Sequence, residues 1–469
     1  MTADAGPTRQ ERPSAADRIA HGKRARRAAP LESHEQLERT GVDPVDVLTA
    51  QAATRVPDLV PIRHGRMLTS PFAFFRGAAA VMAADLASTP TSGFDAQLCG
   101  DAHLSNFGLY RAPDRRMVFD INDFDETLPG PWEWDVKRLV ASMVVASREN
   151  GHDDAETDAI ALATGAAYRE AMRTFAGRTN LAVWYARVDV EDLLAERRSV
   201  LSARQARGTR DLISKAERRD HLSASRKLTH VVDGRRRLIS DPPLLVPVED
   251  LDPTRHESQI AADLRHVLDG YSASLARDRR VLLDQYEVVH LARKVVGVGS
   301  VGTRAFVVLL AGRDDTDLLL LQAKEAQASV LATHLGPAGD LTQGHRVVAG
   351  QHLMQAASDI FLGSLSVTGT DGAVRDFFVR QLRDGKGSVP VGELAPRGLT
   401  VYGRLCAWTL ARAHARSGDR LAIAGYLGKS ERFERALVGF ARSYADLNAA
   451  DHAALKGAVR TGRLTAVDA

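Results

Sequence analysis

The spacing of apolar residues along the chain predicts where its helices and strands lie. In the first third, apolar residues recur at helical spacing over 70–86 and 132–147, and β-branched or aromatic runs predict short strands within 94–103 and 115–124. Helical spacing then continues through most of 151–285. The first part of the chain is therefore expected to be mainly helical, with two short strands that each run into a polar loop.

The pattern changes near residue 286, where β-branched and aromatic residues become dense. Strands are predicted there, followed by a helix and another strand, before the chain returns to helical spacing. The predicted ranges are 286–300, 303–313 and 317–325 for the strands, 343–359 for the helix, 376–384 for the next strand, and 401–419 and 431–448 for the last helices. This alternation predicts a protein of the α+β class.

Composition and charge narrow the possible classes of function. The chain has 469 residues, 44% of them hydrophobic, which is enough material for a large buried core. Its net charge of +3 argues against a strongly basic nucleic-acid-binding protein. Residues 197–237 are locally basic, but the chain has 53 Arg and nine Lys, so a solvated helix face is the better interpretation.

Two further absences exclude other classes. Cys99 and Cys406 are the only cysteines, so a disulfide scaffold and a multi-cysteine metal site are excluded. No segment has the length and apolarity of a membrane span or of a signal-peptide core. We therefore expect a cytoplasmic protein without a membrane partner.

Two polar segments after the predicted short strands carry candidate chemistry. The first, Gly100–Asn106, has Asp101 and Asn106 five positions apart, and the second is Asn122–Glu126, with Asp123 in an Asp-Phe-Asp turn. Transfer of a phosphoryl group from a nucleotide needs a carboxylate near the accepting hydroxyl and hard oxygen ligands for Mg²⁺. Kinases supply these groups as an Asp, an Asn five positions later, and an Asp-Phe-Gly-like turn after the next strand.

A glycine-rich segment lies much later in the chain, at 297–302. It connects two predicted strands, whereas the glycines of a dinucleotide-binding fold open a helix. A strand–loop–strand hairpin is the arrangement with which kinases cover ATP phosphates, and a lysine on the third strand binds them. A lysine that ends an apolar strand also has a plain structural explanation, since its amine reaches solvent at the sheet edge. The candidates for a nucleotide site are Gly297, Gly299, Ser300, Gly302, Lys324 and the adjacent Glu325.

The whole set of motifs resembles an uncharacterised bacterial family called domain of unknown function 2252. The shared phrases are GDAHLSNFG, NDFDET, PWEWDVKRL, RKVVGVGSVGTR, LLQAKEA, GQHLMQAASDIFLG and FVRQLRD, which together span roughly residues 60–450. They cover nearly the whole chain and are highly specific. That family name implies no established activity.

A more distant resemblance does imply an activity. GDAHLSNFG, then NDFDE, then Trp134-Asp135 is similar to the catalytic stretch of aminoglycoside and choline kinase-like phosphotransferases. The resemblance implies ATP and Mg²⁺ as cofactors and an unknown small-molecule or protein acceptor. The roles that it implies are catalytic base for Asp101, metal ligands for Asn106 and Asp123 with Asp125 beside them, loop brace for His103, and structural support for Asp135.

The order of the motifs differs from that of kinases, because the catalytic loop near residue 100 precedes the glycines at 297–302. Helix 403–416 looks like the helix that normally runs into a catalytic loop. We therefore expect a circularly permuted, two-lobed kinase-like fold, with a small, mostly antiparallel sheet lobe and a larger helical lobe. In such a fold Lys324 faces Asp123 across a cleft, within roughly 12 Å, because one nucleotide spans both.

This interpretation divides the chain into segments with separate roles. The first is a flexible N-terminal arm, expected because of its high content of Ala, Pro and charged residues. The expected segments are 1–60 for the arm, 61–150 for the catalytic-loop half of the helical lobe, 151–285 for a helical insertion, 286–390 for the nucleotide-binding lobe, and 391–469 for helices that complete the helical lobe.

The sequence does not identify an acidic partner for Lys324. Three functions other than a kinase-like phosphotransferase therefore stay open. Glu325 would face the other side of the strand, and helix 343–357 offers Gln351 and Gln355 but no acid. A nucleotide-binding pseudokinase and a kinase-like protein that transfers the nucleotidyl group therefore remain open. So does a metallophosphoesterase with Asp101-Ala102-His103 as a ligand segment and Asp123 or Asp125 as a bridge, although it leaves the glycine loop without a role.

Overall fold

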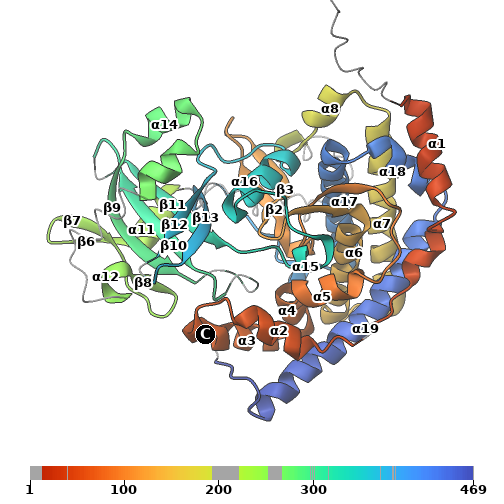
Figure 1. The fold of residues 1–469 in the computed structure, drawn as a ribbon, viewed down its shortest axis with the longest axis horizontal. Coiled ribbons are helices and arrows are strands. Elements are labelled where there is room, and N and C mark those ends of the chain that lie inside the picture. The colour runs from red at the N-terminus through yellow and green to blue at the C-terminus, as the bar shows by residue number, and fades with distance from the viewer. Residues whose placement is uncertain are drawn as a thin grey trace, which may run out of the picture.

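The structure is a computed structural model with two lobes, one rich in sheet and one helical, that lie side by side in Figure 1. It describes residues 13–39, 41–192, 221–251, 267–295, 297, 299, 301–314, 316–369, 371–382, 385 and 387–467. The sheets are antiparallel, so the predicted α+β class is confirmed. Within the described residues, every helix is too short or too polar to cross a membrane.

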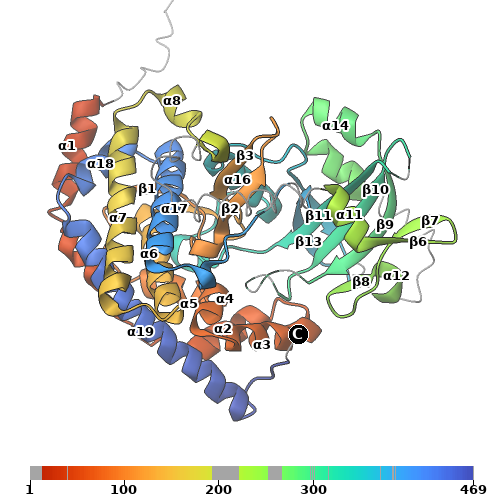
Figure 2. The same cartoon turned by 180° about the vertical axis from the view of Figure 1, so that it is seen from behind.

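The helical lobe is built around α6 (Trp132–Glu149), in which all residues from Trp132 to Ser147 are buried. A helix that is buried around its whole circumference has partners on every side. Those partners are α7 (Asp154–Ala176), α17 (Pro396–Ser417) and α19 (Arg432–Arg460), with α18 (Arg420–Leu427) beyond α7. Figure 2 shows α19 along the outer edge of this lobe.

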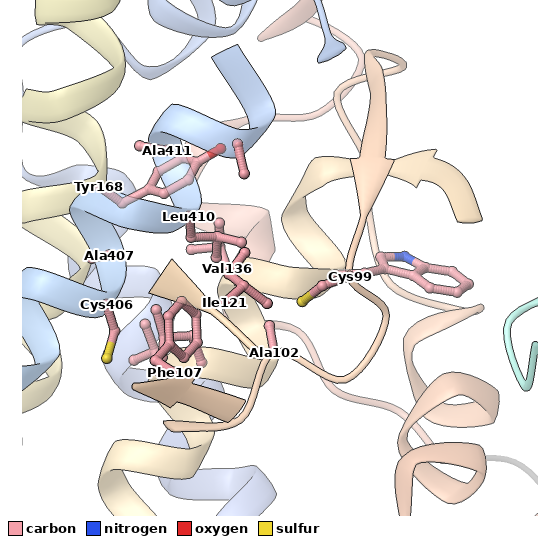
Figure 3. Packing of buried hydrophobic residues seen from close by; sticks show 14 of the residues in the cluster. Cys99, Ala102, Phe107, Ile121, Val136, Tyr168, Cys406, Ala407, Leu410 and Ala411 are labelled. Carbon is pink, nitrogen blue, oxygen red and sulfur yellow. The ribbon is translucent and has the colours of Figure 1, made fainter. Parts of the chain in front are cut away.

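Short strands connect α6 to the polar loops. The strand β1 (Asp95–Leu98) pairs with β4 (Leu128–Pro131), and β2 (Phe107–Arg111) pairs with β3 (Met117–Ile121), which also pairs with β5 (Val188–Asp189). Figure 3 shows Phe107 and Ile121 packed with Val136 and Leu410, which ties these strands to α6 and α17. The register sets Phe107 opposite Ile121, so the loops before β2 and after β3 meet at one end of the pair.

The sheet lobe contains one six-stranded antiparallel sheet with the order β12-β13-β11-β10-β9-β8. Its strands are β8 (Leu245–Pro247), β9 (Glu287–Lys294), β10 (Ala305–Ala311), β11 (Leu318–Ala326), β12 (Gly363–Thr368) and β13 (Val374–Gln381). The helix α16 (Gln343–Met354) follows the third of the predicted strands and packs against β12 and β13. In Figure 1 it lies between the sheet and the helical lobe.

The range 151–285 contains more strand than its spacing predicts. Besides β5 and β8, it holds the hairpin of β6 (Thr229–Val232) and β7 (Arg235–Leu238). Asp233 and Gly234 both have positive φ in its turn, as the favoured Asp-Gly hairpin turn requires. The strand after that turn was not predicted because it consists mainly of arginines and therefore has no apolar spacing. The basic stretch 197–237 and the predicted helix near 260–276 lie partly outside the described residues.

The described part of the predicted N-terminal arm is folded against the helical lobe. In α1 (Ala15–Ala25), Arg18 makes a bidentate ion pair with Asp419 at the start of α18, and Gly22 is in close contact with the α18 backbone. Composition failed to predict this because the helix is held mainly by polar contacts of Arg18 and Arg26 and by close packing at Gly22, without a large apolar face. Residues 1–12 lie outside the described residues.

The remaining elements cover the two lobes. Those next to the helical lobe are η1 (Leu31–Glu35), α2 (Pro44–Ala52), η2 (Pro57–Leu59), α3 (Val60–Leu68), α4 (Pro71–Gly77), α5 (Ala79–Leu86), η3 (Leu104–Asn106), α8 (Asn180–Trp184), α15 (Ala332–Leu335) and η4 (Val391–Glu393). Those on the sheet lobe are α11 (His221–Leu228), α12 (Val248–Leu251) and α14 (Arg277–Leu283).

The helix predicted over 70–86 is divided into α4 and α5 at Ala78. At the break, the Arg63 guanidinium donates a hydrogen bond to the Gly77 carbonyl oxygen, at 2.7 Å. That carbonyl would otherwise accept the next hydrogen bond of a continuous helix. The break leaves the end of α4, with Arg76, directed toward the space between the lobes.

A buried histidine makes the stability of the helical lobe depend on pH. His34 is fully buried, its Nε2 lies 2.5 Å from the Tyr426 hydroxyl, and its ring meets that of Phe433 edge-on. Burial, with a smaller effect of the nearby Lys137 charge, lowers the pKa of His34 to about 3. The folded chain therefore keeps this ring neutral at pH values where the unfolded chain protonates it.

We expect acid to destabilise the native chain more than a His34→Gln variant. The contribution of neutral His34 is fully present above about pH 6.5 and is lost as the pH falls toward 3, by up to about 1.4 kcal/mol per pH unit. Urea denaturation of both proteins at several pH values between about 7.5 and 4 measures the difference. If the free energy of unfolding had the same pH dependence in both proteins, neutral His34 would not be the source of the acid sensitivity.

Candidate functional site

A cavity of about 220 Å³ lies between the two lobes. The helical lobe contributes the two predicted polar loops, and the sheet lobe contributes the glycine loop and the end of β11. A third wall comes from α2 and α4, which precede every predicted motif. The lining residues with polar or charged side chains are Gln51, Thr54, Arg55, Arg76, Asp101, His103, Asn106, Asp123, Asp125, Glu126, Thr303, Glu325 and Gln327; Gly297 and Gly299 cover them.

Most of the predicted site residues thus meet at one cavity although they lie far apart in the chain. Gly302 and Lys324 are adjacent to its wall, while Ser300 lies outside the described residues. The position of the cavity follows from the β2–β3 register on one side and from the β10–β11 hairpin on the other.

Asp135 fixes the backbone of the first polar loop from the first turn of α6. Its carboxylate oxygens accept hydrogen bonds from the backbone N–H groups of Cys99 and Gly100, at 2.8 and 3.0 Å, and His414 Nε2 lies 3.3 Å away. Gly100 has φ of +80°, and a Cβ at this position would collide with the Glu126 carbonyl oxygen. The chain can therefore make this turn only with glycine, because the left-handed conformation and the close approach coincide.

Asp101 follows this turn and is held in a charged environment. Arg138, one helical turn after Asp135 on α6, donates from Nε to Asp101 Oδ1 at 2.6 Å while its guanidinium stacks on the Phe75 ring. His103 Nε2 lies 3.7 Å from Asp101 Oδ2. Burial raises the pKa of Asp101, and the Arg138 charge opposes this effect. Asp101 also lines the cavity, so its carboxylate lies at the boundary between the charged support of α6 and the space between the lobes.

Asn106 and Asp123 present oxygen atoms suited to a hard cation. The Asn106 side-chain N–H group donates to the Asp101 carbonyl oxygen at 2.8 Å, so its amide oxygen points elsewhere. Burial opposes ionisation of Asp123, but the charges of Lys324 and Arg380 outweigh it and lower its pKa to about 2. Mg²⁺ is commonly bound by one or two protein oxygens together with substrate phosphates. The chemistry of this donor pair fits that ion.

Lys324 forms an ion pair with Asp125 across the two lobes. The β10–β11 register sets Lys324 opposite Ala305, directly beneath the glycine loop. The other side chains that the sequence offered as partners of Lys324 make different contacts. Glu325 accepts from the Arg304 backbone N–H at 3.0 Å, and the Gln355 amide donates to the Ile121 carbonyl. The acid that the sequence left unassigned therefore comes from the Asp-Phe-Asp turn, not from a helix of the sheet lobe.

Arg346 on α16 is a site residue that sequence reasoning missed. Its guanidinium donates to the backbone carbonyl oxygens of Thr127, Asp125 and Gln327, at 2.6, 2.8 and 2.9 Å. It thereby ties the Asp-Phe-Asp turn to the end of β11. Its isolated position among apolar residues of a predicted helix was the available signal, but in an arginine-rich chain that signal is weak.

The glycine loop is held from outside by the α2–α3 segment. Arg66 donates to the Gly297 carbonyl oxygen at 2.6 Å, Arg55 donates to the Val301 carbonyl, and the Val56 N–H donates to Gly302 at 2.7 Å. Behind this segment, the Val467 N–H donates to the Pro61 carbonyl at 3.0 Å. The loop is thus supported by the α2–α3 segment, which is itself backed by the C-terminal end of the described chain; Figure 1 shows that end beside α3.

Comparison with known proteins gives a family but no activity. A family model described as "Uncharacterized protein conserved in bacteria (DUF2252)" matches residues 55–458. Neither the curated proteins nor the solved structures include a match. The matched range contains every residue that lines the cavity except Gln51 and Thr54.

We expect Gly100→Ala to destabilise the chain far more than the matched change Gly151→Ala. Both glycines have positive φ, but an added Cβ meets the Glu126 backbone at Gly100 and open space at Gly151. The expected losses in the free energy of unfolding are about 3 kcal/mol or more and about 1–2 kcal/mol, respectively. Chemical denaturation of both variants measures them, and equal losses would contradict the tight packing of the Gly100 turn.

Proposed function

The chain belongs to the bacterial family DUF2252, whose description names no activity, and on the basis of its cavity we propose that it is an ATP- and Mg²⁺-dependent phosphotransferase with a kinase-like, circularly permuted fold. The observation that carries this proposal is the Lys324–Asp125 ion pair beneath the glycine loop. It joins the lysine that would bind phosphate in one motif to the turn that would bind metal in another, 199 residues apart. Phosphoryl transfer needs these two parts on one nucleotide.

Each part of the proposed reaction has a residue in a suitable position. Lys324 would bind the phosphates under the cover of Gly297 and Gly299, after exchanging its contact with Asp125. The oxygens of Asn106 and Asp123 would hold Mg²⁺, which neutralises phosphate charge when bound. Asp101 would accept the proton of the acceptor hydroxyl, on the oxygen that Arg138 leaves open.

Two contacts support the permuted connection. The Gln97 N–H in β1 donates to Ser417 Oγ at the end of α17, at 3.1 Å. A Cβ on the next residue, Gly418, would lie 2.8 Å from the Asp95 carbonyl oxygen. The end of α17 is therefore adjacent in space to β1, the strand that leads into the proposed catalytic loop. In an unpermuted kinase the corresponding helix would be connected directly to this strand.

One departure from the kinase pattern favours a second candidate, a nucleotide-binding pseudokinase. In kinases the strand lysine pairs with a helix glutamate, and in this chain α16 supplies glutamines while Asp125 pairs with the lysine. The metallophosphoesterase alternative receives no such support, because the described part of the chain has no group of three or more His, Cys, Asp or Glu side chains that could hold a metal ion.

We expect Mg²⁺ and ATP together to stabilise the purified protein. Ligand at about 100 times its Kd raises the free energy of unfolding by about 2.7 kcal/mol. Thermal denaturation with ATP, ADP or GTP, with and without Mg²⁺, measures the effect. Asp123→Asn should lose the Mg²⁺-dependent part, whereas Asp446→Asn, which removes a surface partner of Arg148, should keep it. The absence of a shift with every nucleotide at millimolar concentration would overturn the proposal.

Asp101→Asn should separate binding from transfer. The amide oxygen still accepts from Arg138, so nucleotide binding should be retained while turnover falls by about 10²–10⁴-fold with loss of the base. ATP labelled at the γ-phosphate, incubated with a pool of small hydroxylated acceptors and with a protein extract, measures transfer; label at the α-phosphate reports nucleotidyl transfer. Full turnover in the variant would refute the role of Asp101, and binding without turnover in the wild-type chain would favour the pseudokinase.

A further inference from the structure

Three arginines of the α2–α4 region gather behind and along the third wall of the cavity. Arg55 and Arg76 line it, and Arg63 lies directly behind, donating to the Gln51 side chain and to the Gly77 carbonyl. Arg55 and Arg63 are buried, and Arg76 is largely so. Within the described residues, no carboxylate forms an ion pair with any of the three, and each has a buried Nε without a hydrogen-bond partner.

This cluster is unfavourable for a protein with an empty cavity. Guanidinium groups remain protonated, and a buried charge costs several kcal/mol unless an opposite charge or hydrogen bonds offset the loss of water. The nearest carboxylates act on these arginines only at longer range: Glu126 and Asp125 on Arg55, and Asp101 and Asp123 on Arg76. The wall therefore fits an anion inside the cavity.

Arg76 occupies the position most relevant to transfer. Its own backbone carbonyl lies against Gly299, where an added Cβ would be 3.3 Å from that oxygen. Its side chain enters the same cavity as Asp101, His103 and Asp123. It thus lies against the glycine loop and lines the same cavity as the proposed base, and its guanidinium forms no ion pair with any of the described residues.

We propose that Arg76 is a catalytic residue that binds the phosphoryl group during its transfer, a role that rests on the proposed function. The bond from the γ-phosphorus to the oxygen bridging to the β-phosphate breaks, the bond to the acceptor oxygen forms, and the acceptor proton passes to Asp101. ADP is the leaving group, and Arg76 stays protonated throughout. A planar guanidinium matches two phosphoryl oxygens at once, and a cation at this position neutralises charge that develops in the transition state.

Arg55 has a different part in this arrangement. One of its N–H groups is already bound to the Val301 carbonyl, so it holds the glycine loop while adding positive charge to the same wall. We therefore expect Arg76, and not Arg55, to distinguish the transition state from the ground state.

The experiment compares two complexes of the Arg76→Gln variant and the wild-type chain. Mg²⁺–ADP represents the ground state, and Mg²⁺–ADP with aluminium fluoride imitates the transferring phosphoryl group. We expect the variant to bind Mg²⁺–ADP within about twofold of wild type but to lose at least about 10²-fold in the affinity gained from aluminium fluoride. Arg76→Lys keeps the charge but not the planar guanidinium. Its gain in affinity from aluminium fluoride should lie between those of the wild-type chain and Arg76→Gln.

Arg148→Ala serves as the matched control, because it removes an exposed arginine whose ion-pair partner among the described residues is the surface residue Asp446. Circular dichroism and thermal denaturation establish that each variant is folded. An equal loss for both complexes, or no loss for either, would overturn the role of Arg76 while leaving the proposed function intact. Failure of the wild-type chain to bind any nucleotide would instead overturn the proposed function and, with it, this role.

Discussion

The capture of two backbone amides by Asp135 is the interaction on which the site depends. A carboxylate that accepts two N–H bonds in a buried setting is strongly held, because the low dielectric strengthens each bond and penalises its loss. It fixes the turn at Gly100, and one helical turn later Arg138 fixes the Asp101 side chain. Because α6 is buried on all sides, a rigid helix at the centre of the lobe determines the position of the first polar loop.

The second polar loop is positioned by the opposite lobe. Arg346 binds the carbonyl oxygens of Asp125 and Thr127, and Lys324 binds the Asp125 carboxylate. Two cations from the sheet lobe thus hold a segment that the chain attaches to the helical lobe. These polar contacts hold the turn at the cavity, while apolar residues of the sheet lobe such as Val347, Met354 and Phe378 share one core cluster with the helical lobe.

The sequence predicted those features that depend on local pattern. The spacing around α6 and α17, the hairpin that carries the glycines and the placement of Lys324 on the next strand are all found, and the loops of Asp101 and Asp123 meet as their strand ends require. The sequence did not predict the folding of α1, because an ion pair with Asp419 leaves no periodic signal. It also could not predict that Asp125 would pair with Lys324 or that Arg76 would enter the cavity, since both result from the packing of distant segments.

The support behind the glycine loop has a consequence for biosynthesis. The α3 helix, whose Arg66 binds Gly297, is itself bound through Pro61 and His64 to the backbone of Val467 and Thr465. A ribosome makes α3 early but reaches residue 467 only after all of the motifs around the cavity. Between the synthesis of residue 302 and that of residue 465, the loop can therefore form its arginine contacts but lacks the strap that backs them. The backing of the glycine loop is therefore completed only after residues 465–467 have been made, later than every motif around the cavity.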